Sequence, residues 1–365
     1  PPPSLTPRQV RPRSATPRPW NAPNAGPMTN TAARQYSTRL GLLSPDQFQA
    51  ALDRHGLGSF VRAEPIPFGN FGQNVFVTST TGDYVLRGAP HFPWQFPKER
   101  YFTDLLHERT PVPVPWPYIF DPDAAIFGWS YAIMPCMPGV QLSDPDALAK
   151  LTPADRTGIA GAMGTTLAQM HTLVWPHAGE YDLVTNTIQP FGVSHRQWVF
   201  SCIERYLRLA VPLSDRTTAV DVAWVEGLMM QNGWALAVPF EPCFVMQDYK
   251  EGNAVAQCTE GVWRISGVFD YMEPYFGDGE ADLPRQVAVY ADEDPAYARA
   301  FVEAYSEEMR ACGRPLRPGF AERFRLYMLL DRLIIWQFAQ RHGVWWDPEL
   351  TLQAWASPYT ALEVF

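Results

Sequence analysis

The spacing of apolar and polar positions divides the chain into a first part rich in strands and a second part rich in helices. Short apolar runs at 75–77 and 84–86 flank the turn sequence Thr80-Thr81-Gly82-Asp83, a pattern typical of a β-hairpin. A third run at 131–134 predicts a buried strand. Two helices are expected in the same part. One is at 46–56, with Pro45 near its start and Gly56 at its end, and the other is at 97–108, where apolar residues recur at helical spacing.

The second part is predicted to be mostly helical. Asp294-Pro295 supplies a cap and a first-turn proline for one helix, and Gly343 follows the end of another. The expected helices cover 154–172, 198–209, 218–230, 294–313 and 320–341. A group of strands followed by a group of helices predicts an α+β fold with a small antiparallel sheet and a large helical part.

Proline and glycine positions indicate where these parts meet. Residues 1–30 are rich in Pro and Arg and cannot form a core, so we expect a disordered leader. A small N-terminal lobe is expected at 31–134 and a large helical C-terminal lobe at 140–365. The hinge between them is expected at 135–139, where Pro135, Pro138 and Gly139 interrupt regular structure.

Composition and charge narrow the class of protein. The formal net charge is −9, and the first 30 residues hold four Arg and no acid, so the rest is more acidic still. An acidic chain disfavours nucleic acid as a partner and is compatible with a cationic substrate. No apolar segment is long enough to span a membrane. The five Cys form no C-x-x-C pair, which favours reduced thiols and a cytoplasmic location, and the oligomeric state stays open.

One polar stretch carries the spacing of a phosphoryl-transfer site. Asp248 is followed five positions later by Asn253, and Asp270 ends the mainly apolar run 265–269. In such sites one Asp accepts the proton of the attacking hydroxyl, while an Asn and a second Asp hold Mg²⁺ against the phosphates of a nucleotide. We therefore expect Asp248 to be catalytic and Asn253 and Asp270 to bind the metal.

Further features precede this stretch in the order that a nucleotide site requires. Glycines in a turn let backbone N–H groups approach phosphates, a cation at a strand end can lie beneath those phosphates, and a helix Glu can pair with the cation. A hinge segment can meet the nucleotide base. The residues expected in these places are Gly69, Gly72, Arg87, Glu99, Met134 and Cys136. Taken alone, such glycines more often mark an ordinary hairpin turn, a single Arg or Glu is more often a surface charge, and the hinge segment is also typical of an ordinary linker between lobes.

Taken in order, these residues resemble the aminoglycoside phosphotransferase family over about residues 60–340. The family has a strand ending in Leu-Arg or Leu-Lys, a helical Leu-Ala-x-x-His signature, a His-Gly-Asp-x-x-x-x-Asn loop, an Ile-Asp-Trp strand end and a Gly-Asp-Pro-x-x-Asp-Leu segment. The corresponding residues here are Leu86-Arg87, Leu167 to His171, Met246 to Asn253, Phe269-Asp270-Tyr271 and Gly277 to Leu283. The run at 84–87 also resembles hygromycin phosphotransferases.

The resemblance implies the two-lobed fold of protein kinases and a small-molecule phosphotransferase that uses ATP or GTP with Mg²⁺. An aminoglycoside antibiotic is one candidate acceptor, which would imply antibiotic resistance, and another hydroxylated metabolite is a second. The chain departs from the family where Met246 replaces the loop His and Gln247 follows it. Because that His braces the loop and is not the base, the chemistry can survive, but a catalytically silent nucleotide-binding protein stays an alternative.

The acceptor is less well defined by the sequence. Eight carboxylates between 270 and 294 would form either an acidic cleft for a cationic substrate or a solvated acidic loop. Among them, Asp282 is expected to brace the catalytic core. A protein substrate is disfavoured, because the segment after Asp270 lacks the Ala-Pro-Glu sequence of protein kinases.

Overall fold

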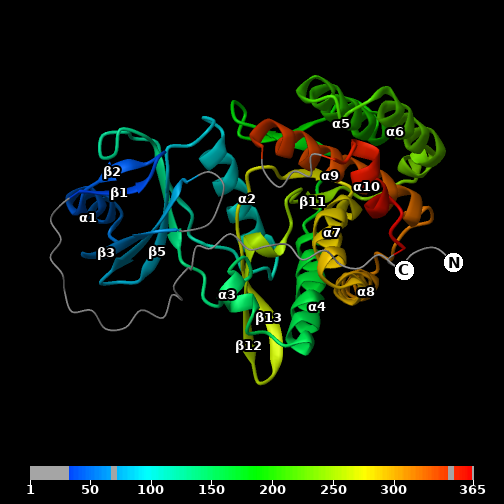
Figure 1. Cartoon of the computed structure of the whole chain (residues 1–365). Helices are drawn as coiled ribbons and strands as arrows, with labels where there is room; N and C mark the ends of the chain where they lie inside the picture. Colours follow the sequence, from blue (N-terminus) through cyan, green and yellow to red (C-terminus); the bar gives the residue numbers. More distant parts are fainter. Residues whose placement is uncertain (1–32, 67–71, 344–348, 364–365) are drawn as a thin grey trace.

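The small N-terminal lobe is built on an antiparallel sheet with the strand order β3-β4-β5-β7-β6, seen in a computed structural model that describes residues 33–66, 72–343 and 349–363 (Figure 1). In the central register, Val77 pairs with Tyr84 and Val85 pairs with Met134. The strands are β3 (Phe60–Pro65), β4 (Asn74–Ser79), β5 (Asp83–Gly88), β6 (Ile119–Asp121) and β7 (Tyr131–Pro135). This sheet lines the side of the cleft that belongs to the N-terminal lobe, as described below.

Helices and a small ribbon complete the lobe. The helix α1 (Pro45–His55) begins with a capping box at Ser44 and buries Phe48 and Leu52 in the same apolar cluster as Val75 of the sheet. The helix α2 (Gln95–Arg109) leads from the sheet toward the large lobe, and its buried residues include Glu99. The ribbon consists of β1 (Arg34–Ser37) and β2 (Gly41–Leu43).

The large lobe is mainly helical and has its own core. Capping boxes at Thr152, Ser194 and Thr218 begin three of its helices, because each side chain accepts from the backbone N–H three residues on. The helices are α3 (Pro145–Leu148), α4 (Pro153–Met170), α5 (His195–Ala210), α6 (Ala219–Asn232), α7 (Leu283–Glu293), α8 (Pro295–Ala311), α9 (Phe320–His342) and α10 (Leu352–Thr360), with the short turns η1 (Val211–Leu213), η2 (Gly233–Ala237), η3 (Glu251–Asn253) and η4 (Gly279–Asp282).

Short strands within this lobe carry the polar stretch. One sheet has the order β13-β12-β8 and another the order β10-β9-β14-β11. Their bounds are β8 (Val140–Gln141), β9 (Gly179–Asp182), β10 (Thr187–Pro190), β11 (Cys243–Val245), β12 (Ala254–Thr259), β13 (Val262–Val268) and β14 (Tyr275–Gly277). In Figure 1 the β12–β13 hairpin lies beside α4, below the junction of the two lobes.

The expected α+β class and two-lobed arrangement are confirmed, and the predicted helices and hairpin agree with α1, α2, α4 to α6, α8, α9 and β4–β5 to within a few residues. Three helices were missed, and the first is the four-residue α3. The second is α7, which lies in the acidic stretch, although Leu283, Val287 and Tyr290 recur at helical spacing and are buried. The third is α10, which packs on α9 through Trp355 and Trp336.

The remaining sequence expectations concern membranes and disulfides. Within the ranges that the structure describes, no helix is long and apolar enough to cross a membrane. All five cysteines lie in those ranges and none is in a disulfide. The expected disordered leader at 1–30 lies outside the described residues.

Candidate active site

The backbone brings the two candidate metal ligands together although they are separated by a whole hairpin. Asn253 ends the turn before β12, and Asp270 follows β13. The backbone N–H of Phe269 donates to the carbonyl oxygen of Asn253 at 3.0 Å. This hydrogen bond places the next residue, Asp270, close to Asn253. Asp270 has φ of 76°, a left-handed conformation that turns the chain sharply at this point.

Asp248 is held by three donors from different directions. Its Oδ1 accepts from Arg285 Nη1 at 2.7 Å, and its Oδ2 accepts from Lys250 Nζ at 2.7 Å. Asn253 Nδ2 donates to the same Oδ2 at 3.1 Å and to the Asp248 carbonyl at 2.9 Å. The Asp248 side chain is still 28% exposed, which leaves it accessible to a substrate hydroxyl.

Two of these partners were missed in the sequence. Lys250 lies only two residues from Asp248, and that spacing was itself a signal, because both side chains belong to one short loop. Arg285 lies 37 positions later, on α7, and its Nε also pairs with Asp331 of α9. No local pattern joins Arg285 to Asp248 or Asp331, so only the packing of α7 beside the loop and α9 shows these contacts.

The loop before Asp248 is braced through its backbone. The carboxylate of Asp282 accepts from the backbone N–H groups of Met246 at 2.7 Å and Gln247 at 2.6 Å, and His171 Nε2 lies 3.3 Å from the same carboxylate. The Met246 side chain is fully buried in the apolar core. The expected bracing role of Asp282 is therefore confirmed, and the loop is fixed without a histidine at 246.

Arg87 and Glu99 form the expected ion pair inside the cleft. Arg87 Nη1 donates to Glu99 Oε2 at 2.8 Å, and its Nη2 lies 3.3 Å from Asp270 Oδ1. Burial raises the pKa of Glu99, while Arg87 and the hydroxyl of Tyr118 lower it by a smaller amount. The guanidinium thus connects the sheet, α2 and the candidate metal ligand Asp270.

A chain of buried amides links this ion pair to the glycine-containing turn. Gln95 Nε2 donates to Gln73 Oε1 at 3.0 Å and lies 3.2 Å from Glu99 Oε1. Gln73 in turn donates to the carbonyl of Ala89 at 3.0 Å. Because Gln73 directly follows Gly72, the chain ties the turn to Glu99. Sequence reasoning missed both glutamines, since neither matches a motif.

These residues surround one large cleft between the lobes, with a volume of about 1450 Å³. Of the predicted site residues, it is lined by Gly72, Arg87, Met134, Cys136, Asp248, Asn253 and Asp270. Glu99 lies behind Arg87, and Gly69 lies outside the described residues. At the hinge, Cys136 N–H donates to the Asp83 carbonyl at 2.9 Å, and burial raises the pKa of its thiol to about 11, so it stays protonated at neutral pH.

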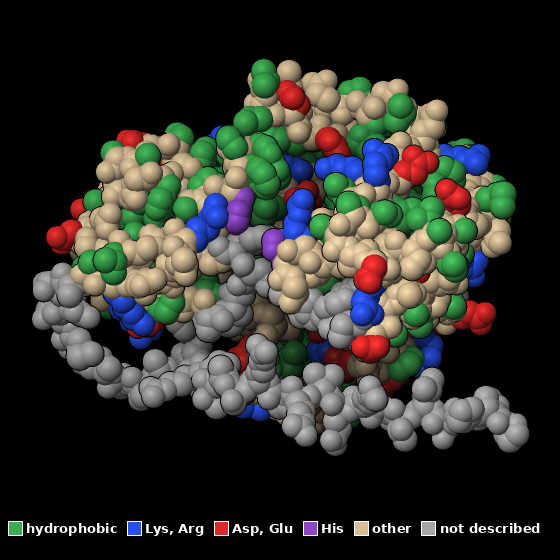
Figure 2. Space-filling view, turned by 45° about the horizontal axis from the view of Figure 1, so that its top comes forward, with side chains coloured by type: hydrophobic (Ala, Val, Ile, Leu, Met, Phe, Trp, Pro, Cys, Tyr) green, Lys and Arg blue, Asp and Glu red, His purple; other side chains and the backbone are tan. Residues whose placement is uncertain are grey.

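The sequence left two alternatives for the eight carboxylates of the acidic stretch, an acidic cleft and a solvated loop. The structure shows neither arrangement. Of the eight, only Asp270 and Asp292 line the cleft. Asp282 braces the loop, Glu293 pairs with Arg156, and Asp294 caps α8. Acidic and basic side chains of the described residues are interspersed on the face shown in Figure 2, so charges of one sign do not gather there.

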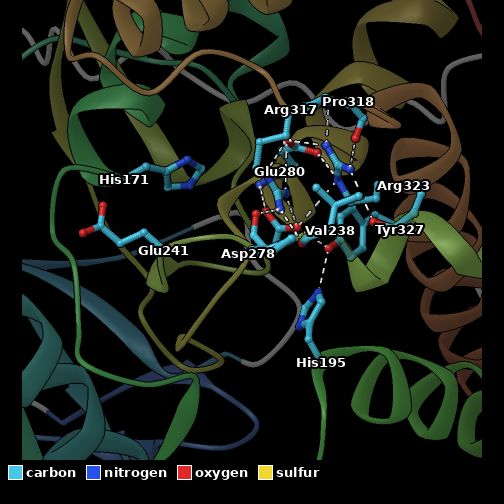
Figure 3. A network of polar contacts seen from close by, with 12 residues as sticks. His171, His195, Val238, Glu241, Asp278, Glu280, Arg317, Pro318, Arg323 and Tyr327 are labelled. Atoms are coloured by element: carbon cyan, nitrogen blue, oxygen red, sulfur yellow. Dashed lines mark hydrogen bonds and ion pairs between the residues drawn. The ribbon is translucent and has the colours of Figure 1, made fainter.

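Two further carboxylates of this stretch, Asp278 and Glu280, belong to a buried network of polar side chains (Figure 3). Arg323 donates to both oxygens of Glu280, at 2.8 Å and 3.0 Å, and Arg317 pairs with Asp278. The hydroxyl of Tyr327 donates to Asp278 at 2.6 Å, and His195 Nε2 lies 2.8 Å from that hydroxyl. Burial lowers the pKa of His195 to about 4, so the imidazole is neutral at pH 7.

The donor atoms near Asp270 fit a magnesium ion better than a metal that needs several protein ligands. No group of three or more His, Cys, Asp or Glu suited to a metal occurs in the described part of the chain. Mg²⁺ prefers oxygen ligands and is commonly held by one or two side chains together with phosphates and water. The carboxylate of Asp270 and the amide oxygen of Asn253, whose nitrogen faces Asp248, match that preference.

Two lobes around this cleft, with a paired Arg and Glu above it and the Asp248 loop below, define a phosphotransferase of the protein-kinase-like fold. The chain belongs to the phosphotransferase enzyme family APH, whose family model matches residues 62–316. The resemblance to aminoglycoside phosphotransferases is thereby confirmed. A comparison with curated protein sequences found no match.

Solved structures share the fold. Aminoglycoside phosphotransferase APH(4)-Ia is 18% identical with a TM-score of 0.60, and the match covers 87% of this chain and 97% of that one. A thermostable mutant of that protein, in ternary complex with ADP and hygromycin B, is 17% identical with a TM-score of 0.57 over 85% and 95% of the chains. Choline kinase LicA from Streptococcus pneumoniae is 13% identical with a TM-score of 0.55 over 87% and 98%. At these identities the likeness shows the fold alone.

Proposed function

We propose that the protein transfers the γ-phosphoryl group of a nucleoside triphosphate to a hydroxyl of a small molecule. The observation that carries this proposal is the meeting of Asp248, Asn253 and Asp270 on one wall of the cleft, with Arg87 on the facing lobe. Each of these residue types has a distinct task in phosphoryl transfer, and few other reactions require this combination.

In the proposed reaction, Asp248 orients the acceptor hydroxyl and takes its proton as the oxygen attacks the γ-phosphorus. The new P–O bond forms while the bond from the γ-phosphorus to the β–γ bridging oxygen breaks, and the nucleoside diphosphate leaves with that oxygen. Arg87, fixed by Glu99, holds the phosphates of the nucleotide. Positioning and charge neutralisation provide most of the rate enhancement in reactions of this kind.

We further propose that Asn253 and Asp270 hold Mg²⁺, which would neutralise charge on the β- and γ-phosphates. The nucleotide base would lie against Met134 and Cys136 at the hinge. Either ATP or GTP is compatible with this arrangement, and the ADP complex of the APH(4)-Ia mutant supports the use of a nucleotide. The hygromycin B in that complex and the name of choline kinase LicA keep both an aminoglycoside and another hydroxylated metabolite as candidate acceptors.

One observation favours a second candidate, a nucleotide-binding protein without turnover. Both carboxylate oxygens of Asp248 already accept from cations, Arg285 on one side and Lys250 on the other. An acceptor hydroxyl must share or displace one of these contacts before the proton moves. Lys250 is the easier to displace, because its side chain is 33% exposed while that of Arg285 is 12% exposed.

A phosphoryl-transfer screen separates the two candidates. Purified protein is incubated with Mg²⁺ and either ATP or GTP, together with a panel of aminoglycosides and of neutral and acidic hydroxylated compounds. Transfer to at least one acceptor, lost in Asp248→Ala while nucleotide binding persists, supports the proposal. Binding of Mg²⁺–nucleotide without transfer to any acceptor would favour the silent protein instead.

A further inference from the structure

The acceptor end of the cleft has a composition of its own. It adjoins Asp248 through Arg285 and is formed by α7, α9 and α10 of the large lobe, and the proposed function places the acceptor there because Asp248 is the base. Its lining residues in the described ranges are Arg285, Val289, Asp292, Arg332, Ile335, Ala339, Trp355 and Tyr359. This wall therefore combines two arginines and one carboxylate with apolar and aromatic side chains.

The two arginines are held rigidly and are largely withdrawn from bulk water. Arg285 bridges Asp248 and Asp331, and Arg332 pairs with Asp331 through Nε and Nη2. The Arg332 guanidinium lies 4.6 Å from the ring centroid of Tyr359 and 5.4 Å from that of Trp355. With side chains 12% and 7% exposed, these guanidinium groups are weakly solvated, so an anion that reaches them gains more than it would at an open surface.

The carboxylates of the C-terminal part of the cleft are already occupied. Asp248 pairs with Lys250 and Arg285, Asp270 pairs with Arg87, and both oxygens of Asp292 accept from the hydroxyl of Tyr359. The remaining one, Asp144, caps α3. A polycationic acceptor would have to compete with these partners, and its amino groups would lie close to Arg285, Arg332 and Lys250.

We infer that the acceptor carries an acidic group, a carboxylate or a phosphate, near the hydroxyl that is phosphorylated, and that Arg285 and Arg332 bind this group. This inference rests on the proposed function and names the substrate class for the same cleft. Arg285 and Arg332 share the carboxylate of Asp331, so an acidic group of the acceptor supplies a further counter-charge to this pair. The aromatic pair Trp355 and Tyr359 then provides the surface against which the body of the acceptor packs.

Calorimetric titration tests the inference apart from catalysis. The protein is first loaded with Mg²⁺ and a non-hydrolysable ATP analogue, so that the nucleotide phosphate site is filled. D-glycerate, glycerol 3-phosphate, glycerol and kanamycin then probe a carboxylate, a phosphate, a neutral polyol and a polycation. We expect at least one of the two acids to bind, and the comparison between them distinguishes carboxylate from phosphate recognition.

Variants of Arg332 identify the site. Arg332→Gln should weaken the binding of the acid about tenfold or more, because a charge-assisted hydrogen bond is lost, and Arg332→Lys should weaken it less. Arg299→Gln, an exposed position on α8 away from the cleft, is the matched control and should bind as the wild type does. Thermal unfolding of each variant shows that it is folded, and Arg332→Lys keeps the test usable if Arg332→Gln is not.

Three results would overturn the inference: neither acid binds, kanamycin binds more tightly than both acids, or the acid binds Arg332→Gln and Arg332→Lys as tightly as the wild type. Failure of the proposed function gives a different result. In that case an acid binds and depends on Arg332, yet no acceptor in the transfer screen is phosphorylated.

Discussion

Two clusters of Asp and Arg take their aspartates from one short stretch of this chain, and they differ in their exposure. Around the cleft, Asp248 is 28% and Asp270 is 31% exposed, and each contacts a cation while part of its surface stays accessible. In the buried network, Asp278 is 4% exposed and is enclosed by Arg317, Tyr327 and Arg323. The same residue types serve reaction chemistry where a ligand has access to them and fix the fold where it does not.

The first prediction tests the cluster of Asp and Arg around the cleft. Asp270→Asn keeps the size of the side chain but removes the negative charge that we assign to metal binding. Activity should fall by at least about a hundredfold, because the charge on the transferring phosphates is less well neutralised. Steady-state kinetics over a range of Mg²⁺ concentrations measures the loss. Unfolding by denaturant should change by less than about 1 kcal/mol, since partly exposed ion pairs contribute little to stability. A large loss of stability with unchanged turnover would reverse the assignment.

The second prediction tests the buried network with the same kind of substitution, Asp to Asn. Asp278→Asn leaves Arg317 and Arg323 in a buried site with one carboxylate instead of two. Breaking a buried pair in this way costs about 3–5 kcal/mol, so the free energy of unfolding should fall by that amount. Turnover per folded molecule should stay within a few-fold of the wild type. A stability unchanged by the substitution would show that the network does not fix the fold.

The third prediction concerns the edge of the buried network. Burial holds the pKa of His195 at about 4, whereas an unfolded histidine binds a proton near pH 6.5. The unfolded state therefore binds more protons between these values, and acidification through this range should lower the stability by about 2–3 kcal/mol. The pH dependence of denaturant unfolding measures this slope, which His195→Gln should reduce. An equal slope in both proteins would assign the acid sensitivity to other groups.

The fourth prediction concerns the amide chain that links the turn to Glu99. Gln95→Leu removes the donor to Gln73 and Glu99, so Glu99 should hold Arg87 less firmly. We expect a threefold to tenfold fall in kcat, about 1 kcal/mol, which is the usual effect of one hydrogen bond. Gln257→Leu, at an exposed position on β12, is the control. A change in stability alone would make Gln95 a purely structural residue.

The comparison of the two clusters also shows how much of the fold and of the site could be predicted from the sequence. The order of strands and helices predicted the fold, because hydrophobic periodicity and helix caps are local signals. The motif around Asp248 predicted which residues would meet in the cleft, since its spacing is fixed by one loop and one hairpin. Asp282 was also correctly expected to brace the loop, and its contacts with the backbone of Met246 and Gln247 explain why the loop holds its shape without a histidine there.

The partners that depend on long-range packing could not be predicted. Counting the carboxylates at 270–294 treated Asp278 and Asp292 as equivalent, whereas Asp278 lies in the buried network and Asp292 on the cleft wall. Arg285 contacts Asp248 only because α7 packs beside the loop that carries Asp248. A charge count along the sequence gives the number of charged residues but does not show which of them are paired. The pairing determines the chemistry of the cleft.

Transfer of the γ-phosphoryl group by the wild type and by Asp248→Asn tests the central claim most directly. Both proteins are compared with γ-labelled nucleotide at concentrations that saturate nucleotide binding, with an acceptor found in the screen. The wild type should label the acceptor, and Asp248→Asn should do so about 10²–10⁴ times more slowly while binding the nucleotide equally well. Equal rates of labelling in the two proteins would contradict the assignment of Asp248 as the catalytic base.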